Sequence, residues 1–283
     1  MSAKRIETII RCLSSLLRQN IGRVVCFALL LCLPLNAFAQ KAAQAKHPPQ
    51  AKSQQERDDF KRAYALTGGS AAEAAADEFS RLYPESELRH YLYSSAMLQY
   101  QREDNSAGML AVGEKVLTLD PDNPLALVLT ATAIADGLAE HDRDRERKIG
   151  LIKRNASRAI QVAETSYSSA GSSTAGLYKT TLQSMAYSAL GMMKLKTGDD
   201  AGAEKDLKAA SELAMARPDP NVWNHLALAQ DHRKKYAAAL NSVEQALQLA
   251  SSNPVLQKLA EAEHERLTGL AKGQRKAGSA EPQ

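Results

Sequence analysis

Two stretches of this 283-residue chain repeat each other at a constant spacing of 36 residues, the first beginning at Tyr187 and the second at Trp223. The same residue types recur downstream in one register. The matching pairs are Leu190 and Leu226, Gly191 and Ala227, Ala203 and Ala239, Leu207 and Val243, Ala210 and Ala246, and Pro218 and Pro254. One small residue can align by chance, but a set of residues in a single register indicates a structural repeat. Such a chain is expected to stack copies of one supersecondary unit.

The repeated unit is predicted to be helical. Nearly every segment between residues 54 and 271 places apolar residues at helical spacing, and alternating β-branched runs and Asn-Gly turns are absent from the sequence. Asn123-Pro124, Asp219-Pro220 and Asn253-Pro254 each put a cap-forming side chain before a proline at the first position of a helix. These signals predict an all-α domain of antiparallel hairpins joined by short turns.

The repeat alternates large and small side chains, and this alternation suggests how the hairpins pack. Large residues such as Trp223 fill space between helices, whereas alanine and glycine mark places where two helices come close. A glycine inside an exposed helix costs about 1 kcal/mol relative to alanine. We therefore expect Gly191 to lie at a close approach between helices.

The order of an aromatic residue, a Leu-Gly pair, an alanine, a bulky residue and another alanine resembles the tetratricopeptide repeat (TPR) family. The residues that carry this resemblance are Tyr187, Leu190, Gly191, Ala203, Leu207 and Ala210 in one repeat, and Trp223, Leu226, Ala227, Ala239, Val243 and Ala246 in the next. The resemblance implies a right-handed α-solenoid of four to five hairpins. The amphipathic segment after residue 253 resembles the capping helix that shields the last hairpin of a solenoid.

Weaker matches continue toward the N-terminus, and one of them contains an insertion. The upstream repeat positions are Phe60, Ala63, Tyr64, Ala72, Ala76 and Phe79; then Tyr93, Ala96, Met97, Tyr100, Met109 and Val116; then Leu127, Ala131, Ile134, Ala156, Ile160 and Ala163. Gly113 stands where the family usually has a bulky residue. The last set has about 13 additional residues, including "EHDRDRERK" at 140–148, which we interpret as a solvated helix extension with a docking spur as the alternative.

The ends of the chain differ from its middle in composition. Residues 1–39 combine a basic leader, the apolar run Val24–Leu35, and small residues at Ala37 and Ala39, which together predict a signal peptide cleaved before Gln40. We expect a spacer at 40–53, the solenoid at 54–271 with a flexible loop at 165–176, and a disordered tail at 272–283. The predicted localisation is periplasmic or secreted, and an uncleaved inner-membrane anchor is the alternative.

Removing the leader changes the charge and the cysteine content. Residues 1–39 hold five of the 36 basic residues and one of the 32 acidic residues, so the remainder carries 31 of each. A neutral chain gives no electrostatic reason to expect nucleic acid as a partner, and a membrane is expected only if the N-terminal segment is retained. Cys12, Cys26 and Cys32 all lie in the leader, so the mature chain has no disulfide, thiol nucleophile or cysteine metal site.

The sequence contains no recognisable catalytic or metal-binding motif. None of the histidines forms an i,i+4 pair with another; they are His47, His90, His141, His225, His232 and His264. Gly-x-Ser-x-Gly and phosphate-binding Gly-Lys-Ser/Thr sequences are absent as well. We therefore predict a protein that is not an enzyme, with no cofactor and no metal.

The resemblance also implies a binding surface. In this family the concave groove is lined by defined positions on the first helix of each hairpin. Those positions are occupied here by Tyr91, Ser94, Leu98, Arg102, Ser188, Met192, Lys196, Asn224, Leu228 and His232, which we call the predicted groove. Its mixture of amide, apolar and cationic groups suits a peptide.

We predict an interaction scaffold of the bacterial envelope that binds a protein or peptide partner. One alternative is an accessory or sensor subunit of an envelope enzyme complex, whose loop at 165–176 closes on a ligand. The other is a membrane-anchored organiser that keeps its N-terminal helix.

Overall fold

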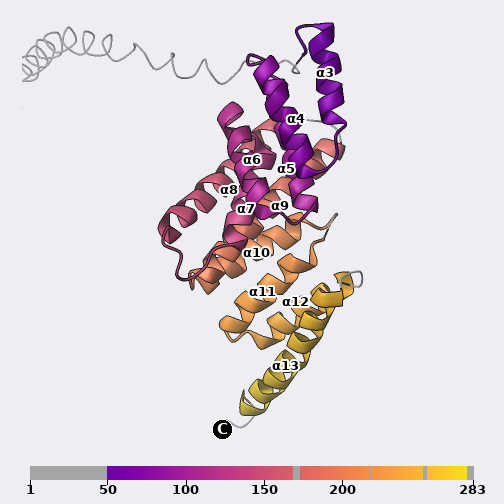
Figure 1. Ribbon diagram of the computed structural model, residues 1–283. Coiled ribbons are helices and arrows are strands. Elements are labelled where there is room, and N and C mark those ends of the chain that lie inside the picture. The colour runs from indigo at the N-terminus through magenta and orange to yellow at the C-terminus, as the bar shows by residue number, and fades with distance from the viewer. Residues whose placement is uncertain (1–49, 168–172, 217, 251–253, 279–283) are drawn as a thin grey trace, which may run out of the picture. The chain divides into compact units, whose positions relative to one another are not determined.

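Eleven helices and no strand occur in the residues that the computed structural model describes, which are 50–167, 173–216, 218–250 and 254–278 (Figure 1). The predicted signal segment 1–39 and residues 40–49 of the predicted spacer lie outside this range. So does Asn253, the third predicted cap. The prediction of an all-α fold is confirmed.

The helices form five hairpins and one final helix, each packed on its neighbour along the chain (Figure 1). The hairpins are α3 (Gln54–Tyr64) with α4 (Gly69–Leu82), α5 (Arg89–Arg102) with α6 (Ser106–Leu119), α7 (Pro124–Asp136) with α8 (Arg145–Tyr167), α9 (Ser173–Lys196) with α10 (Asp200–Leu213), and α11 (Pro220–His232) with α12 (Tyr236–Leu249). The helix α13 (Pro254–Gly278) packs on α12, where the capping helix was expected. This arrangement is an α-solenoid.

The first helices of successive hairpins lie closer together than the second helices do. Close contacts run from α3 to α5, from α5 to α7, from α7 to α9 and from α9 to α11. Among the described second helices, only α4 and α6 make a comparable contact. Elements on the inside of a curved stack approach one another more closely, so the first helices lie on its inner side.

The repeat positions lie in the core of the two C-terminal hairpins. Ala203, Leu207 and Ala210 on α10 are fully buried, and so are their counterparts Ala239, Val243 and Ala246 on α12. On the first helices, Gly191, Leu226 and Ala227 are buried, whereas Tyr187, Leu190 and Trp223 are half-buried. Leu207 and Leu226 share one cluster of buried residues that joins the two hairpins, with Trp223 packed at its edge.

Gly191 marks a close approach between α9 and α10, as expected. A Cβ atom at this position would lie 2.5 Å from Cγ of Leu207, which is itself fully buried. Real Cβ atoms do not come so close to another carbon, so only glycine fits without moving Leu207. Gly113 on α6 is similar, since a Cβ there would lie 2.5 Å from Cγ2 of Thr130 on α7. The absence of a bulky residue at position 113 therefore lets α6 and α7 pack tightly.

Three of the hairpins use the same three-residue turn. Its middle residue has a positive φ in each case, 52° at Asp104, 78° at Gly198 and 59° at Lys234. The third residue donates its N–H to a carbonyl five positions back, over 2.9 Å at Asn105, 2.9 Å at Asp199 and 2.8 Å at Lys235. This bonding satisfies carbonyls at the end of the first helix. Asn105 and Asp199 then cap the second helix through their side chains.

Two predicted proline-based helix starts are confirmed. The Asn123 side chain accepts a hydrogen bond from the N–H of Ala126 at 3.0 Å, and Pro124 is the first residue of α7. Asp219 accepts from the N–H of Asn221 at 2.8 Å, and Pro220 opens α11.

Three segments differ from the expectations at their boundaries. The inserted charged run is not one helix extension: residues 140–144 form a loop, and α8 begins only at Arg145. Its charges pair locally, with Lys148 Nζ 3.0 Å from an oxygen of Asp142. The helices α8 and α9 extend from both sides into the predicted loop at 165–176, and residues 168–172 between them lie outside the described range. At the C-terminus, α13 continues to Gly278, inside the predicted tail.

The middle of the solenoid is built around α7, which neighbours enclose on nearly all sides. This helix contacts α5, α6, α8 and α9, and eight of its residues are buried. A helix that is apolar all round is expected in such a position. Two of its four partners are long helices: α8 has 23 residues and α9 has 24.

Candidate functional site

The α11 part of the predicted groove presents a row of three different side chains. Asn224, Leu228 and His232 are spaced four residues apart and therefore share one face of the helix. Asn224 is half-buried, Leu228 is 39% exposed, and His232 is exposed with its Nδ1 2.9 Å from an Asp200 oxygen. An amide, an aliphatic group and an imidazole thus lie in line on the inner side of the last hairpin.

Met192 does not line an open surface, which corrects the prediction. It is only 6% exposed and belongs to the buried cluster that joins α7, α8 and α9. The long contact between α7 and α9 covers this part of α9. Ser188, one turn earlier, is half-buried, so the groove along α9 is narrower than the sequence predicts.

Lys196, at the end of α9, forms hydrogen bonds to two neighbouring helices. Its Nζ donates to the carbonyl oxygens of Ala135 at 2.9 Å and Asp136 at 2.5 Å, which are among the last carbonyls of α7. The carbonyl of Lys196 in turn accepts a hydrogen bond from Arg145, the first residue of α8. A cation at a helix C-terminus stabilises the unpaired carbonyls there. Lys196 therefore connects the ends of three helices, a role that was not predicted from the sequence.

The α5 part of the predicted groove has a different character. Tyr91 is 41% exposed and its ring centroid lies 4.0 Å from that of His90. Ser94 donates to the carbonyl of His90 at 2.7 Å, and Leu98 is half-buried against the N-terminal core cluster. Arg102 is exposed at the end of the helix. The enclosed helix α7 lies between this block and the residues on α9 and α11.

The extended ends of α8 and α9 bring further aromatic rings near Tyr91. Tyr167, the last residue of α8, packs edge-on against Tyr178 of α9 at 5.2 Å between ring centroids. Burial raises the pKa of Tyr178 to about 12, and Tyr167 adds to that effect. Burial also raises the pKa of Tyr167, with the nearby Tyr91 phenol as a smaller cause. These rings form one aromatic group beside the α5 block.

One half-buried histidine lies at the junction between the middle hairpin and the C-terminal hairpins. His225 on α11 has an enclosed Nδ1 without a hydrogen-bond partner among the described residues. Burial lowers the pKa of His225 more than the nearby carboxylates of Asp136 and Asp219 raise it. Burial raises the pKa of Asp136 on α7 as well. The neutral imidazole is therefore the form that this junction favours.

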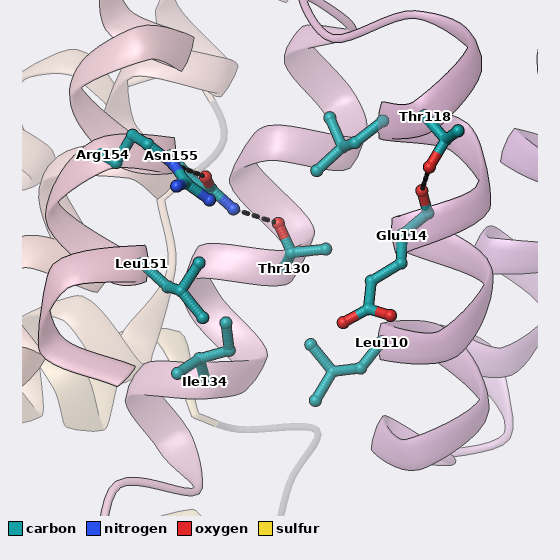
Figure 2. A pocket seen from close by; sticks show the side chains of 9 residues that line it. Leu110, Glu114, Thr118, Thr130, Ile134, Leu151, Arg154 and Asn155 are labelled. Atoms are coloured by element: carbon teal, nitrogen blue, oxygen red, sulfur yellow. Dashed lines mark hydrogen bonds between the residues drawn. The ribbon is translucent and has the colours of Figure 1, made fainter. Parts of the chain in front are cut away.

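A separate pocket opens on the other side of α7, between the second helices α6 and α8. It encloses about 370 Å³, within the size range of small-ligand sites. Figure 2 shows α7 as its floor, with residues of α6 and α8 as opposite walls. We call this the α6–α8 pocket; it is lined by Leu110, Glu114, Leu117, Thr118, Thr130, Ile134, Leu151, Arg154 and Asn155.

The α6–α8 pocket combines an apolar lining with polar groups at defined places. Asn155 is buried, and its amide donates to Oγ1 of Thr130 at 3.0 Å (Figure 2). Arg154 Nε makes a longer contact of 3.4 Å with Oδ1 of Asn155. Glu114 extends from the facing wall. Within the described part of the chain, neither Glu114 nor Arg154 forms an ion pair, so both charges are available to a ligand.

This pocket is not among the sites predicted from the sequence. Leu110 and Leu117 lie seven residues apart on α6, on a face different from the one that holds the buried Met109, Val112 and Val116. A second apolar stripe on a helix that already has a buried face was the available signal.

Two classes of site are not found in the described ranges. These residues contain no group of three or more His, Cys, Asp or Glu side chains arranged to hold a metal ion. None of their helices is both long enough and apolar enough to cross a membrane.

Comparisons with known proteins give only weak structural similarity. No protein-family model matches the chain, and no curated protein sequence matches it. Among solved structures, it resembles TTC0263, a thermophilic TPR protein of Thermus thermophilus, with 17% identity, a TM-score of 0.47, and coverage of 74% of this chain and 98% of that one. At these values the similarity decides nothing about function.

Two further solved structures give weaker similarity. The MamA RS-1 ArsTM double mutant has 15% identity, a TM-score of 0.40, and coverage of 65% of this chain and 96% of that one. A MamA protein has 18% identity, a TM-score of 0.34, and coverage of 69% and 97%. The chain is an α-solenoid of helical hairpins. That statement rests on its own helix pairing, repeated turns and buried small residues.

Proposed function

We propose that this protein is a non-catalytic interaction scaffold of the bacterial envelope, which holds a peptide or protein partner along the inner side of its hairpins. The observation that carries the proposal is the row Asn224, Leu228 and His232 on α11. It offers an exposed apolar side chain between an amide and an imidazole. Amides bond to an extended peptide backbone, and an exposed leucine gains by burial against a partner.

The stacked architecture supports a binding role. Each hairpin is fixed by its neighbours, so an extended surface is presented with little ordering of the protein itself. Tyr91 on α5 adds a second exposed anchor on a first helix, with the aromatic group of Tyr167 and Tyr178 beside it. A partner long enough to reach both would cross the enclosed helix α7.

Site-specific photo-crosslinking in cells tests this role. A photoreactive amino acid is placed at Leu228, at Tyr91, and at Leu82 of α4 as a control that is 49% exposed on a second helix. We expect a discrete cross-linked partner at Leu228 and Tyr91 and none at Leu82. Leu228→Asp should abolish the Tyr91 adduct if one partner spans both helices.

The proposal is wrong if Leu228 and Tyr91 give no adduct, or if Leu82 gives the same adducts at equal yield. Localisation is tested in the same cells. An envelope scaffold processed as the sequence predicts should be found in the periplasmic or extracellular fraction with a mass that begins at Gln40. A mass that includes Met1, found in the membrane fraction, would instead support the anchored alternative.

A further inference from the structure

We infer that the α6–α8 pocket is a second binding site, which takes an aliphatic side chain of a partner peptide flanked by one basic and one acidic group. This site lies on second helices and is independent of the proposed groove on first helices. The inference rests on the shape of the pocket, on the opposite charges of Glu114 and Arg154 at its rim, and on the buried amide of Asn155 in its α8 wall.

The apolar part of the pocket sets the kind of side chain that fits. Leu110 and Leu117 of α6, Ile134 of α7 and Leu151 of α8 are half-buried and surround the space. Their uncovered surface is removed from water when an aliphatic group enters, at roughly 25 cal/mol for each Å² buried. A volume of about 370 Å³ accepts one such side chain with the backbone on either side of it, rather than a long helix.

The charges set what flanks this side chain. Glu114 and Arg154 come from opposite walls, and both are exposed at the rim (Figure 2). An ammonium or guanidinium group on the α6 side would meet Glu114, and a carboxylate on the α8 side would meet Arg154. An apolar centre with a polar rim is the usual anatomy of a site that anchors one side chain of a protein partner.

The buried amide supplies the third contact. Asn155 uses one amide hydrogen on Thr130, and its Oδ1 has only the 3.4 Å contact with Arg154 among the described residues. Asn155 lines the pocket, and its second amide hydrogen has no partner among the described residues. A ligand with a peptide group can accept a hydrogen bond from it, whereas a hydrocarbon cannot. A peptide is therefore favoured over a purely apolar ligand.

Capped tripeptides provide the probe, with leucine between lysine and glutamate in both orders. Methyl NMR of the full chain reports binding directly, because only four isoleucines follow residue 39: Ile134, Ile149, Ile152 and Ile160. We expect the Ile134 methyl signal to shift and saturate with at least one order of the tripeptide. The signal of Ile152, which is fully buried outside the pocket, should stay in place.

Charge reversal then tests recognition. Glu114→Lys should weaken binding of the lysine-containing tripeptide about three- to tenfold, as expected for exchanging an exposed ion pair for a repulsion. Capped Glu-Leu-Glu should recover binding to that variant. Arg154→Glu should likewise weaken binding of the tripeptide, because its glutamate would then meet a carboxylate. Capped Lys-Leu-Lys should recover binding to that variant. Both positions are exposed, so both variants should fold normally.

Three results would overturn the inference. One is an Ile134 signal that no tripeptide shifts, and another is equal binding of capped Lys-Ser-Glu, which has no aliphatic anchor. The third is binding of free leucine as tight as that of the tripeptides, which would make the pocket a small-molecule site. Leu228→Asp serves as the control: it should leave tripeptide binding unchanged, so the groove and the pocket can fail separately.

Discussion

The C-terminal hairpins and the middle hairpin pack their helices with different devices. From Gly191 to Ala246, alanine and glycine set the contacts between helices at a repeat of 36 residues. In the middle hairpin, α7 is buried on nearly all sides, and a polar pair of Thr130 and Asn155 joins it to α8. The regular region offers the exposed row on α11, whereas the irregular region contains the α6–α8 pocket. The irregular packing of the middle hairpin thus creates a pocket, whereas the regular hairpins present an exposed helix face.

The largest effect is expected where the regular packing is tightest. Gly191→Leu should lower the free energy of unfolding by about 3 kcal/mol, because even a Cβ atom would lie 2.5 Å from Leu207. Chemical denaturation measures this loss. Gly150→Leu in α8 is the matched control: a Cβ there would meet nothing within 4 Å, so stability should stay within about 1 kcal/mol. Equal losses for the two variants would remove the distinction between the regions.

The polar pair of the middle hairpin should give the next largest effect. Thr130→Val leaves the buried amide of Asn155 without its partner and should cost about 1–3 kcal/mol. Thr132→Val in the same helix is the control, because its buried hydroxyl has no hydrogen-bond partner among the described residues. That variant should be neutral or stabilising. If both variants unfold at the same denaturant concentration, the Thr130–Asn155 contact does not hold α7 and α8 together.

Substitutions at the middle position of the shared turn should change stability in opposite directions, depending on whether that position holds glycine or another residue. Gly198 has a φ of 78°, so Gly198→Ala should destabilise by about 1 kcal/mol. Asp104 has a φ of 52° without being glycine, so Asp104→Gly should stabilise by up to about 1 kcal/mol. Thermal unfolding of both variants measures the difference. Changes of the same sign would mean that the two turns do not share one backbone conformation.

The smallest effect is expected at the junction between the regions. Burial keeps the pKa of His225 below its ordinary value of 6.5. As the pH falls through about 6.5, the unfolded chain takes up the proton before the folded chain does, so stability present above this pH is lost below it. His225→Gln should therefore reduce the drop in unfolding free energy between about pH 7.5 and about pH 5.5. An unchanged drop would show that other groups cause it.

Much of the fold could be predicted from the sequence because the repeat has a strict spacing. The burial of Ala203, Leu207 and Ala239, and the close approach at Gly191, follow from residue types that recur in one register. Cap signals were equally local, as at Asn123 and Asp219. Such features depend on neighbours in the chain or on the next copy of the unit.

The features that could not be predicted from the sequence depend on contacts that the repeat does not specify. Met192 occupies a groove position by register, but the long contact between α7 and α9 buries it. Lys196 bonds to carbonyls of Ala135 and Asp136, far away in the chain, and no local pattern indicates this. The α6–α8 pocket arises from the spacing of two helices that do not contact each other closely.

The contact between residues 191 and 207 offers the most direct test of packing by small residues. Free energies of unfolding would be measured for Gly191→Ala, Leu207→Ala and the double variant. In the natural background, Gly191→Ala should destabilise by about 1–3 kcal/mol, because its Cβ displaces the buried Leu207. In the Leu207→Ala background, the same change should stabilise by up to about 1 kcal/mol, since the obstacle is gone and alanine favours the helix. Equal effects of Gly191→Ala in both backgrounds would contradict this packing.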